Sequence, residues 1–411
     1  MVDDRQFSEW AEAEGPRILQ TLIDLVNIDT TTPNEWRAYP YLMEYLGGIG
    51  LNPRLEPFPD GIAGHPSYSS SVLLAAGTER CNIRGGLEPP EAGRKVVFNT
   101  HFDVVPATPE FKSAFHGHVK DGFVHGRGSS DSKGSLIMFC EAIRFLLSRG
   151  IPIRKRIGID LVSEEEIGGN GTLACILNGV EADEIVVVEG TELQVYCGHR
   201  GCLTFSVKAI GKPVHMGAYA TGVSSIDCAF KIIQRLRELE ARFMAEAKTD
   251  PYFDIWEGLT PVLIGQIQGG EWPGSVPENC RITGNIGFLP RYTIEQIKQM
   301  LVEKIDTMGD PWIPEHYEIS YPGLKNEAYL TDRGERVVEE LLRAARRCGT
   351  GQERAYGWKV SCDARLYSRL LNIPTVIFGC GSLKYAHSNA ERIAIDDLFG
   401  GMKIVANYLS T

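Results

Sequence analysis

Histidine and acidic side chains follow the apolar segments of this sequence at several points. His101 and Asp103 come directly after a run of apolar, β-branched and aromatic residues, which predicts a buried strand over 95–100. Side chains two residues apart in an extended backbone leave the same face. A histidine beside a carboxylate can serve as a metal ligand together with the group that orients its ring. Alone, such a pair is more often a polar strand end, so its meaning depends on the other sites.

Further acidic and histidine sites stand beside other predicted elements. They are Asp131 before a helix at about 133–149, Glu164, Glu165 and Glu166 after a strand at 157–162, Glu189 after a strand at 184–188, and His387 after a strand at 374–378. In an open α/β sheet the carboxyl ends of the strands line the ligand crevice, so we expect these side chains to converge there. A buried cluster of carboxylates requires positive charge in its midst.

The predicted ligands are imidazoles and carboxylates, without sulfur. This donor set suits two divalent metal ions, with zinc as the first choice and manganese or cobalt as alternatives. Two such ions about 3.5–4 Å apart accommodate a bridging carboxylate and a bridging water. Within the acidic triplet, one glutamate can bind metal while its neighbour acts as general base. Periodicity alone does not assign these two roles.

The order of the predicted elements indicates the fold class. Strands and helices alternate up to about residue 199, and this alternation returns near the C-terminus with a helix at 332–347, the strand at 374–378 and a helix at 396–409. Earlier elements are a helix over about 7–26, a helix over about 39–46 and a strand-like segment at 71–74. We therefore predict an α/β domain with a mostly parallel sheet and helices on both of its faces.

The sequence pattern changes at about residue 200. Residues 202–209 alternate between apolar and polar, as in a half-exposed antiparallel strand. A helix at about 223–247, strand-like segments at 261–265, 280–286 and 316–320, and a helix opened by a Thr293–Gln296 capping box follow. We therefore predict a catalytic domain of residues 1–199 and 322–411, and an inserted α+β domain of residues 200–321.

The composition excludes several classes of partner. The chain has 411 residues, 43% hydrophobic and 23% charged, and a net charge of −11. This acidic balance argues against nucleic acid and against anionic membranes, and no apolar run approaches the ~20 residues of a membrane span. The ten cysteines have no paired spacing and the N-terminus has no apolar leader. We therefore expect a cytoplasmic enzyme that acts on a small molecule.

Five segments together resemble one known family. They are Thr100–Pro106, Gly126–Gly134, Ser163–Gly169, Val188–Thr191 and Ala386–Glu391. In this order they resemble the M20 metallopeptidase/amidohydrolase family, specifically its acetylornithine deacetylase and succinyl-diaminopimelate desuccinylase branch. The resemblance implies that His101, Asp131 and Glu189 bind one metal ion, and that Asp131, Glu166 and His387 bind the other. It also implies a cis peptide bond between Asp131 and Ser132.

The same resemblance implies the remaining roles in the site. Asp103 would orient His101, and Glu165 would be the general base, because Glu164 takes the place of the family's aspartate. The inserted domain resembles the family's lid, through which its members usually dimerise. His215, in Gly211–Gly217, matches the lid histidine that stabilises the oxyanion; the alternative is a histidine that caps a helix on a loop.

One family feature is missing from this sequence. Where family members often carry an arginine that binds a substrate carboxylate, this chain has Ile286 and Gly287. Arg365 and, more weakly, Arg291 are candidates to replace it; ion pairing and surface exposure are the alternatives for both. The acyl group and the amine of the substrate therefore stay open.

The expected reaction is metal-dependent hydrolysis of the amide bond of a small N-acyl amino acid or related N-acyl amine, by a metal-bridging water that Glu165 activates. A dipeptidase, a carboxypeptidase or a hydrolase that releases an aryl or heterocyclic amine is an alternative within the family. A non-catalytic binding relative is disfavoured because every ligand position is filled. A dinuclear phosphoesterase is disfavoured because the ligands lack a cationic cradle.

Overall fold

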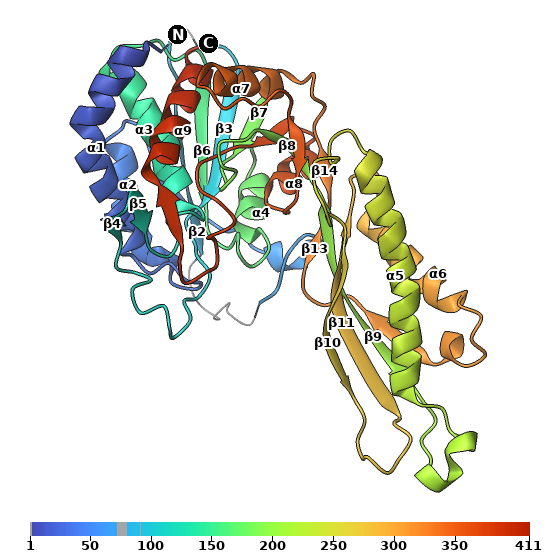
Figure 1. Ribbon diagram of the computed structural model, residues 1–411. Helices are drawn as coiled ribbons and strands as arrows, with labels where there is room; N and C mark the ends of the chain where they lie inside the picture. The colour runs from blue at the N-terminus through green and yellow to red at the C-terminus, as the bar shows by residue number, and fades with distance from the viewer. Residues whose placement is uncertain (1, 72–79, 91) are drawn as a thin grey trace. The chain divides into compact units, whose positions relative to one another are not determined.

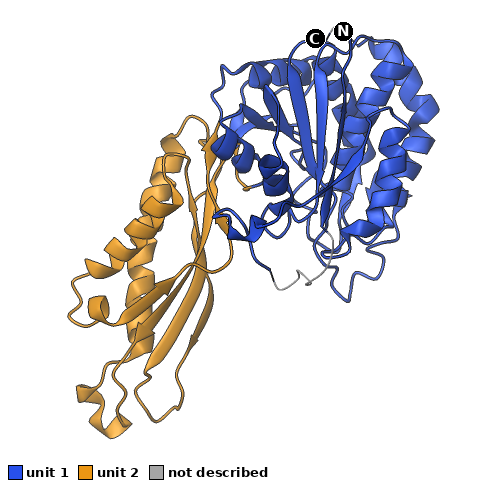
Figure 2. Ribbon diagram, turned by 180° about the vertical axis from the view of Figure 1, so that it is seen from behind, with its two compact units in different colours: residues 1–198, 331–356, 362–411 blue, residues 199–330, 357–361 orange. Residues whose placement is uncertain are grey.

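The computed structural model describes residues 2–71, 80–90 and 92–411, so most of the predicted strand segment at 71–74 lies outside the described residues. The described chain divides into two compact units, coloured separately in Figure 2. Unit 1 comprises residues 1–198, 331–356 and 362–411, and unit 2 comprises residues 199–330 and 357–361. The second unit thus continues to residue 330, beyond the boundary at 321 proposed from the sequence.

Unit 1 is built on a central sheet whose strands run in the order β1-β2-β6-β3-β7-β16-β8. The bounds of these strands are β1 Arg54–Pro57, β2 Cys81–Leu87, β3 Lys95–His101, β6 Arg156–Val162, β7 Glu184–Val187, β8 Tyr196–His199 and β16 Thr375–Ile377. Strand β3 pairs in parallel with both β6 and β7, and β16 pairs in parallel with β7. Antiparallel pairing is found toward the edges, where β2 pairs with β6 and β8 with β16.

Helices cover the sheet of unit 1 (Figure 1). They are α1 Asp4–Val26, α2 Tyr39–Gly47, α3 Lys133–Ser148, α4 Asn170–Leu177, α7 Arg336–Arg347, α8 Ala364–Leu366 and α9 Ile395–Leu409, with short turns η1 Glu35–Ala38, η2 Ile62–Gly64 and η5 Tyr367–Leu371. A small separate sheet contains β4 His118–Lys120, β5 Phe123–His125 and β17 Arg392–Ala394. The α/β class predicted from the sequence, with a mostly parallel sheet, is confirmed.

The centre of unit 1 is apolar because its parallel strands are covered on both faces. Six of the seven residues of β3, and six of the seven of β6, are buried. Phe98 of β3 stacks on Phe139 of α3, with ring centroids 5.2 Å apart. This packing holds α3 against β3.

Unit 2 is a separate α+β structure with an antiparallel sheet in the order β10-β11-β9-β12. Its elements are β9 Gly201–Ile210, η3 Met216–Thr221, α5 Ser225–Thr249, β10 Val262–Gly269, β11 Asn279–Phe288, α6 Ile294–Asp306, η4 Ile313–Glu315, β12 Tyr317–Ser320 and β13 Lys325–Asn326. The short strands β14 Tyr329–Leu330 and β15 Tyr356–Trp358 stand near the points of the chain where the units change. Side chains of α5, α6 and the sheet form one apolar core.

The local predictions hold for most elements of unit 2. The Thr293–Gln296 capping box is present at the start of α6. Strand β9 is antiparallel as predicted, but it is more buried than a half-exposed strand, because β11 and β12 flank it on both sides.

Strand β2 of unit 1 was not predicted, since Gly85 and Gly86 weaken its strand pattern. Within the described residues, no helix combines the length and the apolar character needed to cross a bilayer.

Candidate metal centre

Three neighbouring parallel strands bring acidic and histidine side chains to one edge of the central sheet. His101 is the last residue of β3, and Glu189 follows the end of β7 by two residues. The acidic triplet 164–166 follows β6, which is the other neighbour of β3. Because parallel strands end on the same side, the sheet topology itself gathers these groups.

The remaining two predicted ligands arrive on loops. Asp131 lies two residues before α3, and its peptide bond to Ser132 is cis, as the family resemblance implied. His387 lies in the loop after β16, with a positive φ of 58°. The loop backbone therefore turns sharply at this residue and directs the imidazole toward Asp131 and Glu166.

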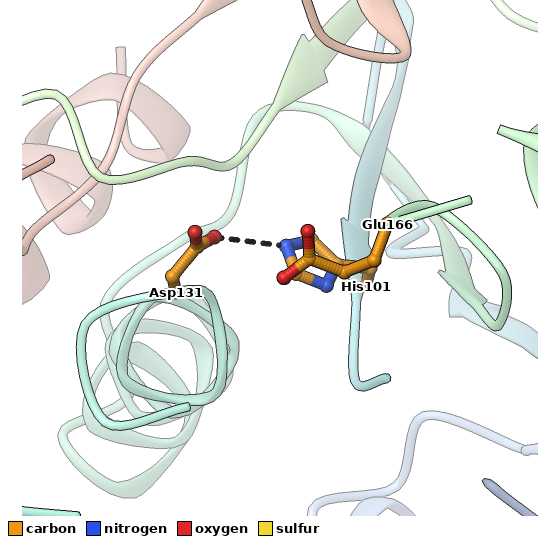
Figure 3. Close-up of side chains that lie close together, drawn as sticks. All are labelled: His101, Asp131 and Glu166. Atoms are coloured by element: carbon orange, nitrogen blue, oxygen red, sulfur yellow. Dashed lines mark hydrogen bonds and ion pairs between the residues drawn. The ribbon is translucent and has the colours of Figure 1, made fainter. Parts of the chain in front are cut away.

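The two oxygens of Asp131 contact two different histidines. Asp131 Oδ1 lies 3.1 Å from His101 Nε2, and Asp131 Oδ2 lies 3.3 Å from His387 Nε2. Figure 3 shows the first of these contacts, with Glu166 beside them. His387 Nε2 is also 3.1 Å from Glu166 Oε2, and His101 Nε2 is 3.8 Å from Glu189 Oε2. We call these five residues the carboxylate–histidine cluster.

The three glutamates of the triplet point to different partners. Glu164 forms an ion pair with Arg80 at 3.2 Å and accepts a hydrogen bond from Asn170. Glu166 contacts His387. The carboxylate of Glu165 is therefore the one whose side chain is engaged neither with Arg80 nor with His387.

Asp103 holds this triplet through the backbone. Its carboxylate accepts the N–H of Glu165 at 3.3 Å and the N–H of Glu166 at 3.1 Å. The contact with His101 is made mainly by the Asp103 carbonyl oxygen, 2.9 Å from Nδ1, while the carboxylate lies 3.6 Å away. Asp103 thus connects the end of β3 to the acidic turn, and its predicted orienting role stays a prediction.

Burial dominates the electrostatics of the cluster. Burial raises the pKa values of Glu165, Glu166 and Glu189, and the neighbouring carboxylates raise them further. Burial would also raise the pKa of Asp131, but its hydrogen bonds with His101 and His387 lower it below its usual value. The hydrogen bonds of His387 with Asp131 and Glu166 raise its pKa to about 10. The buried carboxylates of the cluster are therefore stabilised by positive charge placed between them.

The cluster fits divalent cations. Ligand atoms of His101, Asp131 and Glu166 all lie within 4.8 Å of one another. Imidazole and carboxylate donors without thiolates suit zinc, manganese or cobalt. Two imidazoles that face the two oxygens of one carboxylate match a pair of ions bridged by that carboxylate. Such ions would also remove the repulsion that now raises the carboxylate pKa values.

The predicted substrate-side arginines are both engaged elsewhere. Arg365 is buried, donates to the carbonyl oxygens of Cys362 and Gly168, and lies 3.6 Å from Asp363. Arg291, in unit 2, forms an ion pair with Asp250 at 3.1 Å. These contacts favour structural roles for both arginines, and their substrate-binding role stays a prediction.

His215 lies in unit 2, on an exposed segment before η3. Its Nδ1 accepts a hydrogen bond from the backbone N–H of Gly217 at 3.1 Å, so the imidazole caps this short helix. Nε2 stays available for a second partner. The capping geometry was the alternative interpretation of this residue, and it leaves the predicted oxyanion role untested.

An ion pair beside the cluster, between Arg127 and Glu391, was not predicted from the sequence. Arg127 and Glu391 are both 1% exposed and form an ion pair with each other. A charged residue enclosed by two glycines, as in Gly126–Arg127–Gly128, was the available signal, because such a side chain requires a partner when it is buried.

Known proteins resemble this chain over most of its length. The model of peptidase family M20/M25/M40 matches residues 97–411, well over half of the chain. The N-formyl-4-amino-5-aminomethyl-2-methylpyrimidine deformylase of Halalkalibacterium halodurans is 26% identical over 419 residues, covering 95% of this chain and 92% of that protein. The acetylornithine deacetylase of Myxococcus xanthus is 26% identical over 394 residues, covering 93% of this chain and 94% of that protein.

Solved structures share the fold. A tripeptidase from Staphylococcus aureus superimposes with a TM-score of 0.75 at 23% identity, covering 96% of this chain and 97% of that chain. The family match and the curated relatives confirm the predicted class, an enzyme that hydrolyses C–N bonds. The chain belongs to peptidase family M20/M25/M40, whose metal-dependent hydrolases it resembles in sequence and in fold.

Proposed function

We propose that this protein hydrolyses the amide bond of a small N-acyl amine, with two divalent metal ions held by the carboxylate–histidine cluster. The observation that carries the proposal is Asp131, whose two oxygens lie within 3.1 and 3.3 Å of two separate imidazoles. His101, Asp131 and Glu189 would hold one ion, and Asp131, Glu166 and His387 the other. Zinc is the ion we expect, with manganese or cobalt as alternatives.

Bound ions of this kind polarise the amide carbonyl and lower the pKa of water toward neutrality. The protein's own contribution begins with Glu165, because Glu164 is paired with Arg80 and Glu166 contacts His387. We assign Glu165 as the general base that takes a proton from the attacking water. It then delivers this proton to the leaving nitrogen as the C–N bond breaks, which yields a carboxylic acid and an amine.

Two further residues complete the proposed machinery. Asp103 keeps Glu165 in place, since its carboxylate binds the backbone N–H groups of Glu165 and Glu166. His215 would donate from Nε2 to the oxyanion that develops when water adds to the carbonyl carbon. Its Nδ1 already accepts the N–H of Gly217, which leaves the proton on Nε2 in the neutral imidazole.

The substrate class is supported by the curated relatives. The deformylase and the acetylornithine deacetylase are both named for removal of a small acyl group from nitrogen, and each aligns with more than nine-tenths of this chain. The tripeptidase structure is less than 25% identical and supports the fold alone. We therefore place N-formyl and N-acetyl amines ahead of peptides, and keep a dipeptidase or carboxypeptidase as the alternative.

The test is a substrate panel with metal removal. Purified protein loaded with zinc, manganese or cobalt is incubated with N-formyl aminomethylpyrimidines, N-acetyl amino acids, dipeptides and a phosphate ester, and the released amine is quantified. We expect release of amine from the N-acyl compounds, loss of activity with a chelator, and recovery when metal is restored. Full activity in excess chelator would contradict the metal-dependent mechanism, and turnover of the phosphate ester alone would contradict the amide-bond assignment.

We also propose that unit 2 forms a homodimer. Strand β10 is an edge strand of its sheet, and it carries exposed Leu263 and Ile267. An exposed apolar edge is a template for pairing with another strand.

The free thiols of all ten cysteines support the expected location in the reducing cytoplasm.

A further inference from the structure

The ion pair between Arg127 and Glu391 joins two distant parts of the sequence next to the carboxylate–histidine cluster. Arg127 stands in the loop between β5 and α3, and Glu391 immediately precedes β17. Both side chains are buried. A buried charge is strongly destabilising without a partner, so neither residue is tolerated there without the other.

The carboxylate of Glu391 organises the loop that carries Asp131. Its Oε1 accepts the backbone N–H groups of Gly128 at 2.8 Å, Ser130 at 3.3 Å and Asp131 at 3.2 Å. The backbone carbonyl of Glu391 accepts the N–H of Gly126 at 3.1 Å. Loop 126–131 is therefore folded around one side chain, in the manner of an anion bound in a nest of backbone N–H groups.

The same residue anchors the segment that carries His387. His387 precedes Glu391 by four residues, and a second anchor holds the start of this segment. Ser130 Oγ donates to the carbonyl oxygen of Ser382 at 3.2 Å and accepts the N–H of Ser382 at 2.8 Å. Segment 382–391 is thus fixed to loop 126–131 at both of its ends, by Ser382 and by Glu391.

We propose that Glu391 is a positioning residue that sets the spacing between Asp131 and His387, and thereby the affinity for the metal ion that these two residues share with Glu166. This inference rests on the proposed function, because it presumes that the cluster binds metal. Glu391 itself touches neither His101 nor His387 through its side chain. It acts through the backbone of Asp131 and through the short segment between itself and His387.

The two halves of the site depend on Glu391 to different degrees. In the half with His387, both Asp131 and His387 are held by Glu391. In the half with His101 and Glu189, Glu391 holds only Asp131, because His101 is the last residue of β3 and Glu189 follows β7 in the central sheet. Loss of the Glu391 charge should therefore weaken the binding of one ion more than the binding of the other.

The variant Glu391→Gln removes the negative charge of the side chain and nearly preserves its shape. Its amide oxygen can still accept from the loop N–H groups, but its NH₂ group then faces the guanidinium of Arg127, and two donors cannot satisfy each other. The loop must shift or Arg127 must lose its partner. Glu391→Asp keeps the charge but is one methylene shorter, so it cannot reach Arg127 and all three N–H groups together.

The experiment is a Co²⁺ titration of metal-free protein, followed by visible absorption. Wild type should bind two ions, and His387→Ala should lose tight binding of one. We expect Glu391→Gln to lower the affinity for the same ion about 10–100-fold, as loss of a residue that orients a ligand typically does. In the His387→Ala background, Glu391→Gln should have a smaller effect, because the contact that it supports is already gone.

The matched control is Glu141→Gln. Glu141 of α3 is also a buried carboxylate paired with an arginine, Arg17 of α1, but it does not contact the cluster. This variant should lose stability and keep both Co²⁺ affinities. Wild-type affinities in Glu391→Gln, or an equal loss in Glu141→Gln, would overturn the inference. If Glu391→Gln does not fold, Glu391→Asp decides in the same assay. Wild-type protein that binds no Co²⁺ would instead overturn the proposed function.

Discussion

Asp103 accepts the backbone N–H of Glu166 at 3.1 Å. The same carboxylate accepts the N–H of Glu165 at 3.3 Å, so one buried side chain at the end of β3 holds the turn that follows β6. The carbonyl oxygen of Asp103 lies 2.9 Å from His101 Nδ1. A single residue thus contacts a proposed metal ligand with its backbone and binds the backbone of the acidic triplet with its side chain.

The first prediction concerns Asp103→Asn. The carboxamide presents a donor where the carboxylate has an acceptor, so the N–H of Glu165 or Glu166 loses its partner. We expect metal affinity to fall about 10–100-fold and the free energy of unfolding to fall by about 1–3 kcal/mol. Metal titration and urea unfolding measure the two effects.

Asp310→Asn is the matched control for Asp103→Asn. Asp310 also accepts two backbone N–H groups, those of Trp312 and Ile313 at 2.9 and 3.1 Å, through Oδ1, while its Oδ2 pairs with Lys231 at 2.7 Å. This residue lies in unit 2. This variant should lose stability without losing metal affinity. Unchanged metal binding in Asp103→Asn would contradict the positioning role of Asp103.

The second prediction separates the three glutamates of the triplet. Glu165→Gln should lower the rate about 10²–10⁴-fold and leave metal binding intact, as removal of a positioned base does. Glu164→Gln should keep the rate within a few-fold, because Glu164 pairs with Arg80. Glu166→Gln should lose metal affinity. Steady-state kinetics and Co²⁺ titration of all three variants provide the measurement, and a near-wild-type rate in Glu165→Gln would exclude it as the base.

Much of the site was accessible from the sequence because strand ends carry it. His101, the triplet and Glu189 each follow a segment rich in β-branched and other apolar residues, and parallel strands end at one edge of the sheet. His387 and Asp131 were harder to place by pattern alone, since both lie on loops. The element pattern still placed them near this edge, before the helix at about 133–149 and after the strand at 374–378, and the family resemblance assigned their roles as metal ligands.

Several contacts that escaped prediction are made with the backbone. Arg365 donates to the carbonyl oxygens of Cys362 and Gly168, and Glu391 accepts three loop N–H groups. Backbone groups carry no residue type, so the sequence pattern gives no sign of such partners. The folded structure is needed to tell an arginine that donates to backbone carbonyl oxygens from one whose guanidinium is open to a substrate.

The third prediction concerns pH and stability at Glu340. This carboxylate accepts from Lys155 Nζ at 2.6 Å and from Arg336 Nε at 2.5 Å. Burial opposes its ionisation, but these two hydrogen bonds hold its pKa below the usual value. A carboxyl whose pKa is lowered by folding stabilises the protein above its unfolded pKa of about 4.3. This contribution is lost as the pH falls through the lower folded pKa.

Glu340→Gln should therefore lower the free energy of unfolding by about 1–3 kcal/mol at pH 7. The difference from wild type should stay constant between about pH 6 and 8 and shrink below about pH 4. Urea unfolding at several pH values measures it. Glu335→Gln, at the N-cap of the same helix α7, makes no side-chain cap hydrogen bond and serves as the control. A difference that grows toward acidic pH would refute the assignment.

The fourth prediction tests the edge of unit 2 as a dimer surface. Ile267 on the edge strand β10 is 49% exposed. A lysine on an edge strand opposes pairing with a second strand, so Ile267→Lys should convert a dimer to a monomer. Leu147→Lys is the control, since Leu147 is 44% exposed but lies at the end of α3 in unit 1. Sedimentation velocity measures the oligomeric state. Because the substitution places its charge on an already exposed position, unit 2 should keep its fold, and a dimeric Ile267→Lys protein would exclude β10 from the interface.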